Sequence, residues 1–260
     1  MPLEVHQFAA LQDNYAFLVR DQASRRVACI DTPDAAAILH ELKRLGRELS
    51  MILNTHWHSD HTGGNAEVQA ATRCVAVGPA EVAARIPLDL QVRPGERVVL
   101  GETQFDVLDV GGHTFGHVAY YDAIDDLVFV GDALFTMGCG RLCEGPARQM
   151  WGSLQRLAAL PDQTAVYAAH EYSAVNARFA ISVDGAPATL RRANEIFAAR
   201  ARGEPTVPTT IALEKATNPF PRAPDLAPST SRLTAEHDAF AALRAAKDIF
   251  QGGEDENGRA

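Results

Sequence analysis

Short apolar runs bounded by polar turn residues recur along the chain up to about residue 172. A run of this length between turn residues is typical of a β-strand. The pattern predicts early strands at residues 3–8, 15–20, 26–30 and 51–53. Later strands are predicted at residues 74–77, 97–100, 104–110, 117–121, 127–130 and 165–167.

Apolar residues spaced by three and four positions predict helices among and after these strands. In the helix predicted before residue 46, Thr32 is the expected cap, Pro33 the first residue and Gly46 the end. Further helices are predicted at residues 65–70, 79–86 and 147–160. From residue 173 onward we expect no strands, but helices at 174–183, 188–202 and 233–250 and a proline-rich loop at 219–228.

Many strands with few helices between them favour two packed sheets over one doubly wound parallel sheet. We predict an α/β (α+β) fold, a four-layer αββα sandwich over residues 1–172 with helices on the outside. Residues 173–260 are predicted to form a helical domain that leans on the sandwich. Its polar, glycine-rich tail, from about residue 252, is expected to be disordered.

Composition narrows the possible partners. A chain of 260 residues with 47% hydrophobic residues can bury a real core, and its net charge of −9 argues against general binding of nucleic acid. No stretch approaches the roughly 20 apolar residues of a membrane span, and the N-terminus lacks a signal pattern, so a cytoplasmic protein is expected. The four cysteines show no CxxC spacing and are expected to be reduced.

The strand predicted at 51–53 ends in THWHSDH, which places His56, His58, Asp60 and His61 within a few residues of each other. A glycine pair at 63–64 lets the backbone turn closely under a ligand. Neutral imidazole and carboxylate are the ligands that Zn²⁺ and similar ions take from proteins. A polar loop whose histidines cap the backbone is the structural alternative, and the spacing favours a metal site.

Three later strand ends carry the same kinds of side chain. GGHTFGH at 111–117 offers His113 and His117, one of which should be a ligand, and Asp132 and His170 each follow an apolar strand. A single aspartate or histidine at a strand end is more often structural, but the recurrence outweighs that interpretation. The histidines outside these motifs are interpreted as structural: His6, His40 and His237.

The candidate ligands are too many for one tetrahedral ion, so two ions are implied. They are His56, His58, Asp60, His61, His113, Asp132 and His170. Two such ions can hold a water between them, lower its pKa and present it to a carbonyl or phosphoryl centre. Since the chain has no GxSxG, Walker or GxGxxG motif, the residues predict a metal-dependent hydrolase.

These motifs, in this order and spacing, resemble those of the metallo-β-lactamase superfamily. The stretches LQDNYAFLV, GCGRLCEG, GEPTVPTT, TNPF and RAAKDIF are similar to the hydroxyacylglutathione hydrolase (glyoxalase II) family, so the resemblance covers almost the whole chain. It implies a metallo-β-lactamase αββα sandwich with a helical C-terminal domain. It also implies hydrolysis of S-lactoylglutathione to lactate and glutathione, as in methylglyoxal detoxification.

The resemblance divides the candidate ligands into two triads joined by one carboxylate. It implies His56, His58 and His113 for one metal, Asp60, His61 and His170 for the other, and Asp132 as the bridge. Asp60 and Asp132 would also position the attacking metal-bound hydroxide, with His117 behind the ligands. Two divalent ions per chain are implied; zinc is expected, and iron and manganese remain alternatives because all three accept these ligands.

A thioester suits this chemistry, because a thiol with a pKa of about 8.5 leaves with little help from a general acid. Glutathione carries two carboxylates, so its site needs cations. The resemblance implies substrate contacts at Arg141, Leu142, Cys143, Tyr172, Arg244 and Lys247. Cys143 departs from the family pattern, which has an aromatic residue there, and from the residues alone Arg244 and Lys247 suggest a solvated helix face.

Other functions remain as alternatives. A glutathione-linked persulfide dioxygenase would hold a single iron, and a non-catalytic glutathione-binding module would lack ligands. A β-lactamase would be expected to carry an export signal, and a nuclease a more basic surface. We therefore expect an enzyme that acts on a small-molecule glutathione thioester as a monomer, without a nucleic acid or membrane partner.

Overall fold

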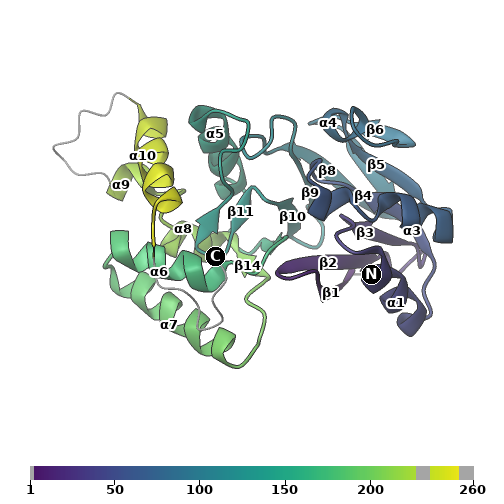
Figure 1. Ribbon diagram of the computed structural model, residues 1–260, viewed down its shortest axis with the longest axis horizontal. Coiled ribbons are helices and arrows are strands. Elements are labelled where there is room, and N and C mark those ends of the chain that lie inside the picture. The colour runs from purple at the N-terminus through teal and green to yellow at the C-terminus, as the bar shows by residue number, and fades with distance from the viewer. Residues whose placement is uncertain (1–2, 227–234, 252–260) are drawn as a thin grey trace.

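The computed structural model describes residues 3–226 and 235–251. Within these residues two six-stranded sheets pack face to face, and helices lie on the outer side of each (Figure 1). The strand order is β1-β2-β3-β4-β5-β6 in the first sheet and β14-β13-β10-β9-β8-β7 in the second. The predicted four-layer arrangement is confirmed.

The first sheet begins as an antiparallel meander and continues with parallel strands from β3 onward. Its strands are β1 (Glu4–Ala10), β2 (Asn14–Arg20), β3 (Val27–Ile30), β4 (Leu49–Leu53), β5 (Val75–Pro79) and β6 (Leu90–Val92). The helices beside it are α1 (Ala35–Leu45), α2 (Ser59–Thr62), α3 (Asn65–Thr72) and α4 (Ala80–Ala83). Because β3 and β4 are parallel, their carboxyl ends lie at the same edge of the sheet.

The second sheet is antiparallel except for the parallel pair β10 and β13. Its strands are β7 (Arg97–Leu100), β8 (Thr103–Asp109), β9 (Val118–Asp122), β10 (Leu127–Gly131), β13 (Ala165–Ala168) and β14 (Thr209–Thr210). A small hairpin follows β10 and consists of β11 (Leu134–Phe135) and β12 (Gly138–Cys139). Helix α5 (Ala147–Ala158) comes between this hairpin and β13.

The main core fills the space between the sheets. Phe17 of β2 lies 5.5 Å, ring centre to ring centre, from Phe129 of β10, and Phe105 of β8 is fully buried beside them. A second cluster lies on the other face of the first sheet, where Ile38 of α1 and Ile52 of β4 are buried. Burying such large side chains contributes about 1.5–3 kcal/mol each, so this packing fixes the strand ends that carry the candidate ligands.

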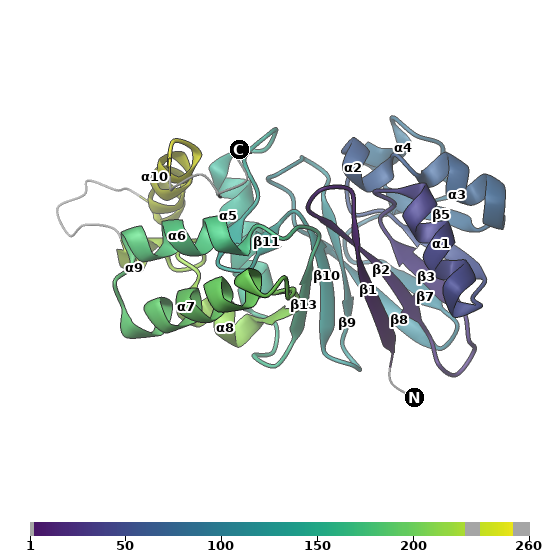
Figure 2. The ribbon, with the colours of Figure 1, turned by 60° about the horizontal axis from the view of Figure 1, so that its bottom comes forward.

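The C-terminal helices gather at the end of the molecule away from α1 and α3 (Figures 1 and 2). They are α6 (Ser173–Val183), α7 (Pro187–Ala201), α8 (Ile211–Thr217), α9 (Ala223–Leu226) and α10 (Glu236–Asp248). Trp151 of α5 contacts Phe240 of α10, and Phe179 of α6 stacks on Phe220. These helices therefore lean on the sandwich, and the domain boundary after residue 172 stays a prediction.

The predicted start of the first helix is wrong. Helix α1 begins at Ala35, and its cap is Asp34, whose carboxylate accepts hydrogen bonds from the backbone N–H groups of Ala36 and Ala37. Thr32 is buried, and its hydroxyl donates to Asn65 Oδ1 at 2.5 Å. The backbone N–H of Thr32 also donates to the His61 carbonyl at 2.8 Å, so Thr32 is bound to the segment from His61 to Asn65 and does not cap α1.

The sequence pattern did not predict several short helices and strands. These are β6, β11, β12, β14, α2, α8 and α9. The expectation of no strands after residue 173 and of a plain loop at 219–228 is therefore wrong. The helix predicted at 79–86 is only α4, because Pro79 is the last residue of β5 and residues 84–86 form a turn after the helix. The predicted tail from residue 252 and the first two residues of the last predicted helix lie outside the described residues. Among the residues described, no helix is long and apolar enough to cross a membrane.

Candidate metal centre

The candidate ligands gather where strands of both sheets end. The loop after β4 and helix α2 carry four of them: His56, His58, Asp60 and His61. His113 lies in the loop after β8, Asp132 follows β10, and His170 follows β13. The structure brings all seven side chains into three overlapping groups, each close enough to share a metal ion.

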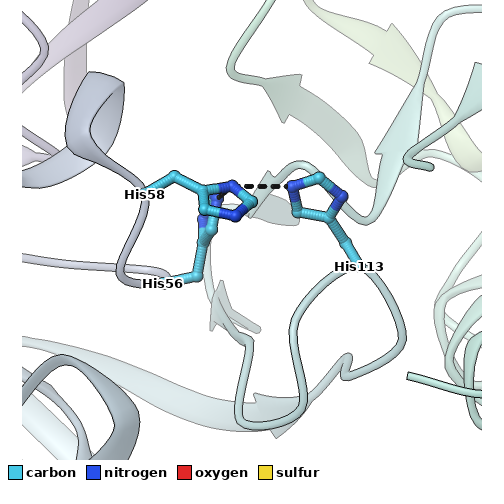
Figure 3. Close-up of side chains that lie close together, drawn as sticks. All are labelled: His56, His58 and His113. Carbon is cyan, nitrogen blue, oxygen red and sulfur yellow. Dashed lines mark hydrogen bonds between the residues drawn. The ribbon is translucent and has the colours of Figure 1, made fainter. Parts of the chain in front are cut away.

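The first triad consists of three imidazole rings whose nitrogens face one another. Nδ1 of His58 lies 3.0 Å from Nε2 of His56 and 3.0 Å from Nε2 of His113 (Figure 3). A tetrahedral ion bonded to nitrogens at about 2.0–2.1 Å separates them by roughly 3.3 Å. A small inward or outward shift of these rings therefore suffices to hold one ion.

The second triad mixes a carboxylate with two imidazoles. Oδ2 of Asp60 lies 3.4 Å from Nε2 of His61 and 3.3 Å from Nε2 of His170. The two imidazole nitrogens are themselves 3.3 Å apart. Asn14 donates to Asp60 Oδ2 at 3.2 Å and holds the carboxylate toward the rings. This set of donors fits a second divalent ion of the same kind.

Asp132 joins the two triads. Its Oδ1 lies 3.3 Å from Nε2 of both His61 and His170, and its Oδ2 lies 3.4 Å from Nε2 of His113. Oδ1 is buried and has no hydrogen-bond partner, although the imidazoles are near. A buried carboxylate oxygen without a partner is costly unless a cation satisfies it. The residues therefore fit a pair of metal ions with Asp132 between them.

The far sides of the imidazoles are also held, and this orients the ring nitrogens that face the centre. Nδ1 of His61 contacts Asp31 Oδ2 at 2.8 Å, and Nδ1 of His170 contacts Asp13 Oδ1 at 2.9 Å. Nδ1 of His113 donates to the Arg141 carbonyl at 2.9 Å. Partners of this kind leave Nε2 free for a metal and make the ligand more basic. The sequence did not predict the roles of Asp13 and Asp31; the available signal was an acidic residue beside a strand, in the turn before β2 for Asp13 and directly after β3 for Asp31.

Between the two histidines left open by the sequence, the geometry places His113 in a triad and His117 behind it. The ring of His117 stacks on His56, and its Nε2 accepts a hydrogen bond from the backbone N–H of Asp132 at 3.0 Å. Burial lowers the pKa of His117 to about 3, so the ring stays neutral and can accept this bond. His117 thereby fixes the backbone that carries Asp132.

Gly131 makes this close approach possible. It has a φ of +48°, and a Cβ there would lie 2.6 Å from the hydroxyl of Thr55 and 2.7 Å from the ring of His117. A side chain at this position would therefore push apart the loops that carry His56 and Asp132.

The charges of the site attract cations. Burial raises the pKa of Asp132 and Asp60, but the neighbouring histidines, His170 and His61, outweigh it and hold both carboxyls well below their usual range. Burial lowers the pKa of His61 and His170, and Asp132 more than reverses this. Protons and metal ions thus compete for the same nitrogens, and metal affinity falls as the solution becomes more acidic.

The residues predicted to contact substrate lie on two sides of this centre. Arg141 and Cys143 are exposed, with the Cys143 thiol 3.7 Å from Nδ1 of His113, and Leu142 is half-buried between them. The Tyr172 ring is parallel to the ring of His170, with centres 4.7 Å apart. All four cysteines are free thiols.

The two predicted cations of α10 differ in accessibility. Arg244 is only 4% exposed, and its guanidinium donates to the Cys139 carbonyl at 3.0 Å and to Asp248 at 2.9 Å. Lys247 is half-buried, and its ammonium donates to the Val175 carbonyl at 3.0 Å. Burial first, and the charge of Arg244 second, lower the pKa of Lys247 to about 8. Lys247 is therefore the more accessible of the two cations.

A further group near the centre was not predicted. Trp57, between two candidate ligands, donates from Nε1 to Glu144 Oε1 at 3.0 Å, and the guanidinium of Arg85 lies 4.1 Å from the Trp57 ring centre. Glu144 also accepts the backbone N–H of Phe115 at 3.1 Å. The group ties three loops around His58 and His113 together. Its members are far apart in sequence, and no local pattern connects them.

Comparisons with known proteins agree with this site. Residues 23–170 match the family model of the metallo-beta-lactamase superfamily, and residues 171–250 match that of the hydroxyacylglutathione hydrolase C-terminus. A hydroxyacylglutathione hydrolase of Maricaulis maris is 49% identical over 95% of this chain and 99% of its own length. The structure of ETHE1 from Myxococcus xanthus has a TM-score of 0.70 and 28% identity, and the match covers 96% of this chain and 93% of that one. TTHA1623, solved in a di-iron-bound form, has a TM-score of 0.61 and 26% identity over 84% of this chain and 99% of that one.

The fold and the paired histidine and carboxylate groups define a member of the metallo-β-lactamase superfamily whose site is suited to metal ions. The match of the C-terminal helices and the near full-length similarity to curated relatives narrow this class further. The chain belongs to the hydroxyacylglutathione hydrolase family, also called glyoxalase II.

Proposed function

We propose that this chain hydrolyses S-(2-hydroxyacyl)glutathione, with S-lactoylglutathione as the reference substrate, to a 2-hydroxy acid and glutathione. The observation that carries the proposal is the position of Asp132 between the two triads. One carboxylate oxygen faces the first triad, and the other oxygen faces the second. We assign His56, His58 and His113 to one ion, Asp60, His61 and His170 to the other, and Asp132 to both.

When bound, two divalent ions polarise the thioester carbonyl and lower the pKa of the attacking water. We propose zinc as the metal because histidine and carboxylate donors suit it. Iron is the alternative, because the similar protein TTHA1623 was solved in a di-iron-bound form. The chain itself holds the imidazoles by their far nitrogens and keeps Asp60 and Asp132 ionised. Asp60 and Asp132 then orient the attacking water toward the carbonyl carbon.

The leaving group explains why the site needs no dedicated acid. A glutathione thiol has a pKa of about 8.5, so the thiolate departs near neutral pH without a proton from the protein. A persulfide dioxygenase with one iron is the alternative, and the complete second triad of Asp60, His61 and His170 favours the hydrolase over it.

We propose that glutathione lies between the loop of Arg141 and the end of α10. Arg141 and Lys247 supply positive charge for its carboxylates, and Tyr172, stacked on His170, supplies a hydroxyl. Arg244 acts by holding the Cys139 carbonyl, and so positions the segment that carries Leu142 and Cys143. The thiol of Cys143 gives this side less contact than an aromatic ring would.

The proposal is tested by assaying S-lactoylglutathione beside a lactoyl thioester of a simple thiol, with metal content measured on the same sample. We expect two divalent ions per chain and a much higher kcat/KM for the glutathione thioester. Equal kcat/KM for both substrates would remove the glutathione assignment. One iron per chain with oxygen consumption on glutathione persulfide would replace the hydrolase by the dioxygenase.

Lys247→Ala is expected to raise KM for S-lactoylglutathione about tenfold, with little change in kcat, because one charged hydrogen bond to the substrate is lost. The lowered pKa means that Lys247 is charged below about pH 8 and neutral above it. KM of the wild type should therefore rise above pH 8, and Lys247→Arg should remove this rise. The measurement is KM by steady-state kinetics from pH 6.5 to 9, corrected for spontaneous hydrolysis of the thioester. A wild-type KM that does not change with pH would contradict the contact assigned to Lys247.

A cytoplasmic location, a monomeric state and a boundary between two domains after residue 172 remain predictions from the sequence. Size-exclusion chromatography with light scattering tests the monomer, and expression of residues 1–172 alone tests the boundary.

A further inference from the structure

A second site lies at the edge of the first sheet opposite the metal centre. A cavity of about 420 Å³ opens there between the β2–β3 turn and the α1–β4 connection. Its polar lining includes four arginines: Arg20, Arg25, Arg26 and Arg47. We propose that this arginine cavity binds the phosphate group of a small phosphorylated molecule. The inference is independent of the proposed hydrolysis.

The topology separates the two sites. Arg26 precedes β3 and Asp31 follows it, while Arg47 precedes β4 and the histidine loop follows it. In Figure 2, helix α2 lies at one end of these strands and the end of α1 at the other. The strands have four and five residues, and at about 3.3 Å per residue the sites lie roughly 15 Å apart. The cavity is therefore no extension of the metal centre.

The arginines of the cavity are incompletely neutralised. Arg47 pairs with Glu4 through one nitrogen, but its Nη1 is buried and has no partner, and Arg20 lies 3.5 Å from the same carboxylate. The exposed side chains of Arg25 and Arg26 have no ion-pair or hydrogen-bond partner among the residues described. Glu48 is the acidic residue in the lining. Positive charge is thus in excess here, in a chain whose net charge is −9.

This chemistry selects a phosphate group. Guanidinium groups carry donors in a planar fork that matches the oxygens of phosphate, and several of them around one cavity favour a multiply charged anion over chloride or a single carboxylate. Ser24 and Ser50 also line the cavity, although the Ser24 hydroxyl is already hydrogen-bonded to Asp21 and to the backbone N–H of Arg26. A volume of about 420 Å³ falls within the usual range of small-molecule sites, so an organic body can accompany the phosphate. A nucleic acid would need a broad basic surface, which the net charge of −9 argues against.

The site is tested on the metal-loaded enzyme by NMR titration with inorganic phosphate, at constant ionic strength maintained with chloride. We expect saturable shifts of the backbone amides of residues 20–26 and 46–50, with sulfate giving weaker binding at the same place. Arg25→Gln combined with Arg26→Gln should weaken binding at least tenfold. Arg93→Gln combined with Arg191→Gln, two exposed arginines elsewhere, removes the same charge and should leave the affinity within twofold.

A second variant is expected to strengthen phosphate binding, and such a gain cannot result from a damaged fold. Glu4→Gln removes the carboxylate that competes for Arg20 and Arg47, and it should tighten phosphate binding several-fold. Shifts confined to the metal loops, a linear response without saturation, or unchanged affinity in the Arg25/Arg26 variant would overturn the proposal. A second titration, with glycerol 3-phosphate, shows whether an organic group attached to the phosphate adds affinity. If glycerol 3-phosphate binds more weakly than inorganic phosphate, the site takes only the free anion, and the assignment to a phosphorylated molecule is overturned.

Discussion

Asp132→Ala is expected to abolish hydrolysis and metal pairing together, with kcat/KM for S-lactoylglutathione falling by about 10³-fold or more. Among the residues that the structure describes, Asp132 alone presents oxygens to both triads, with Oδ1 at 3.3 Å from Nε2 of His61 and His170 and Oδ2 at 3.4 Å from Nε2 of His113. Without it, no protein carboxylate would contact both groups of ligands. We expect at most one ion per chain by elemental analysis.

The control for this variant is Asp162→Asn, an exposed carboxylate that pairs with Lys215 far from the centre. It removes the same charge and should retain both ions and full activity. Thermal unfolding of the metal-free proteins separates a lost site from a lost fold. An Asp132→Ala protein that keeps two ions and activity within tenfold of the wild type would show that Asp132 is not the bridge.

The clustering of the candidate ligands was predictable because each follows an apolar strand within a short motif. His56, His58, Asp60 and His61 share one loop, so their proximity needs no knowledge of the fold. The two-sheet architecture was predictable for a related reason, since alternation and turn residues define most strands locally. The fold then brings the loops after β4, β8, β10 and β13 to one edge.

The supporting residues were not predictable, because their partners are distant in sequence. Asp13 contacts His170, and Glu144 contacts Trp57, only after both sheets have formed. Elements of two or three residues, such as β6, β11 and β14, are too short to show any periodicity. Threonine is a suitable helix cap, but the hydroxyl of Thr32 is hydrogen-bonded to Asn65, which is distant in sequence, and Asp34 caps the helix instead.

Asp31 supports the histidine loop at three points. It is 4% exposed and has a φ of +53°. Oδ1 accepts the backbone N–H of Thr55 at 2.8 Å, and Oδ2 lies 2.8 Å from both the Thr55 hydroxyl and Nδ1 of His61. The carboxylate therefore fixes the start of the histidine loop and keeps the proton of His61 on Nδ1, so that Nε2 faces the centre.

Asp31→Asn should weaken metal affinity about 10- to 100-fold and lower the free energy of unfolding by about 1–3 kcal/mol. Asparagine keeps only one acceptor oxygen, and the backbone N–H of Thr55 needs it at the Oδ1 position. The amide nitrogen then faces Nδ1 of His61 and cannot accept its proton, so His61 shifts this proton to Nε2 and loses its metal-facing lone pair. Asparagine tolerates a positive φ, so backbone strain does not confuse the result. Competition with a chelator gives the affinity, and excess metal should restore activity.

The matched control for Asp31 is Asp34→Asn, three residues along the chain, where asparagine caps a helix as well as aspartate does. It changes the same charge and should alter neither metal affinity nor stability. If Asp31→Asn binds metal as tightly as this control, the carboxylate has no part in orienting His61. Asp60 and Asp132 contact Nε2 of His61 and cannot hold a proton on Nδ1, so the preference of Nε2 for a metal ion would then have to keep the proton on Nδ1 by itself.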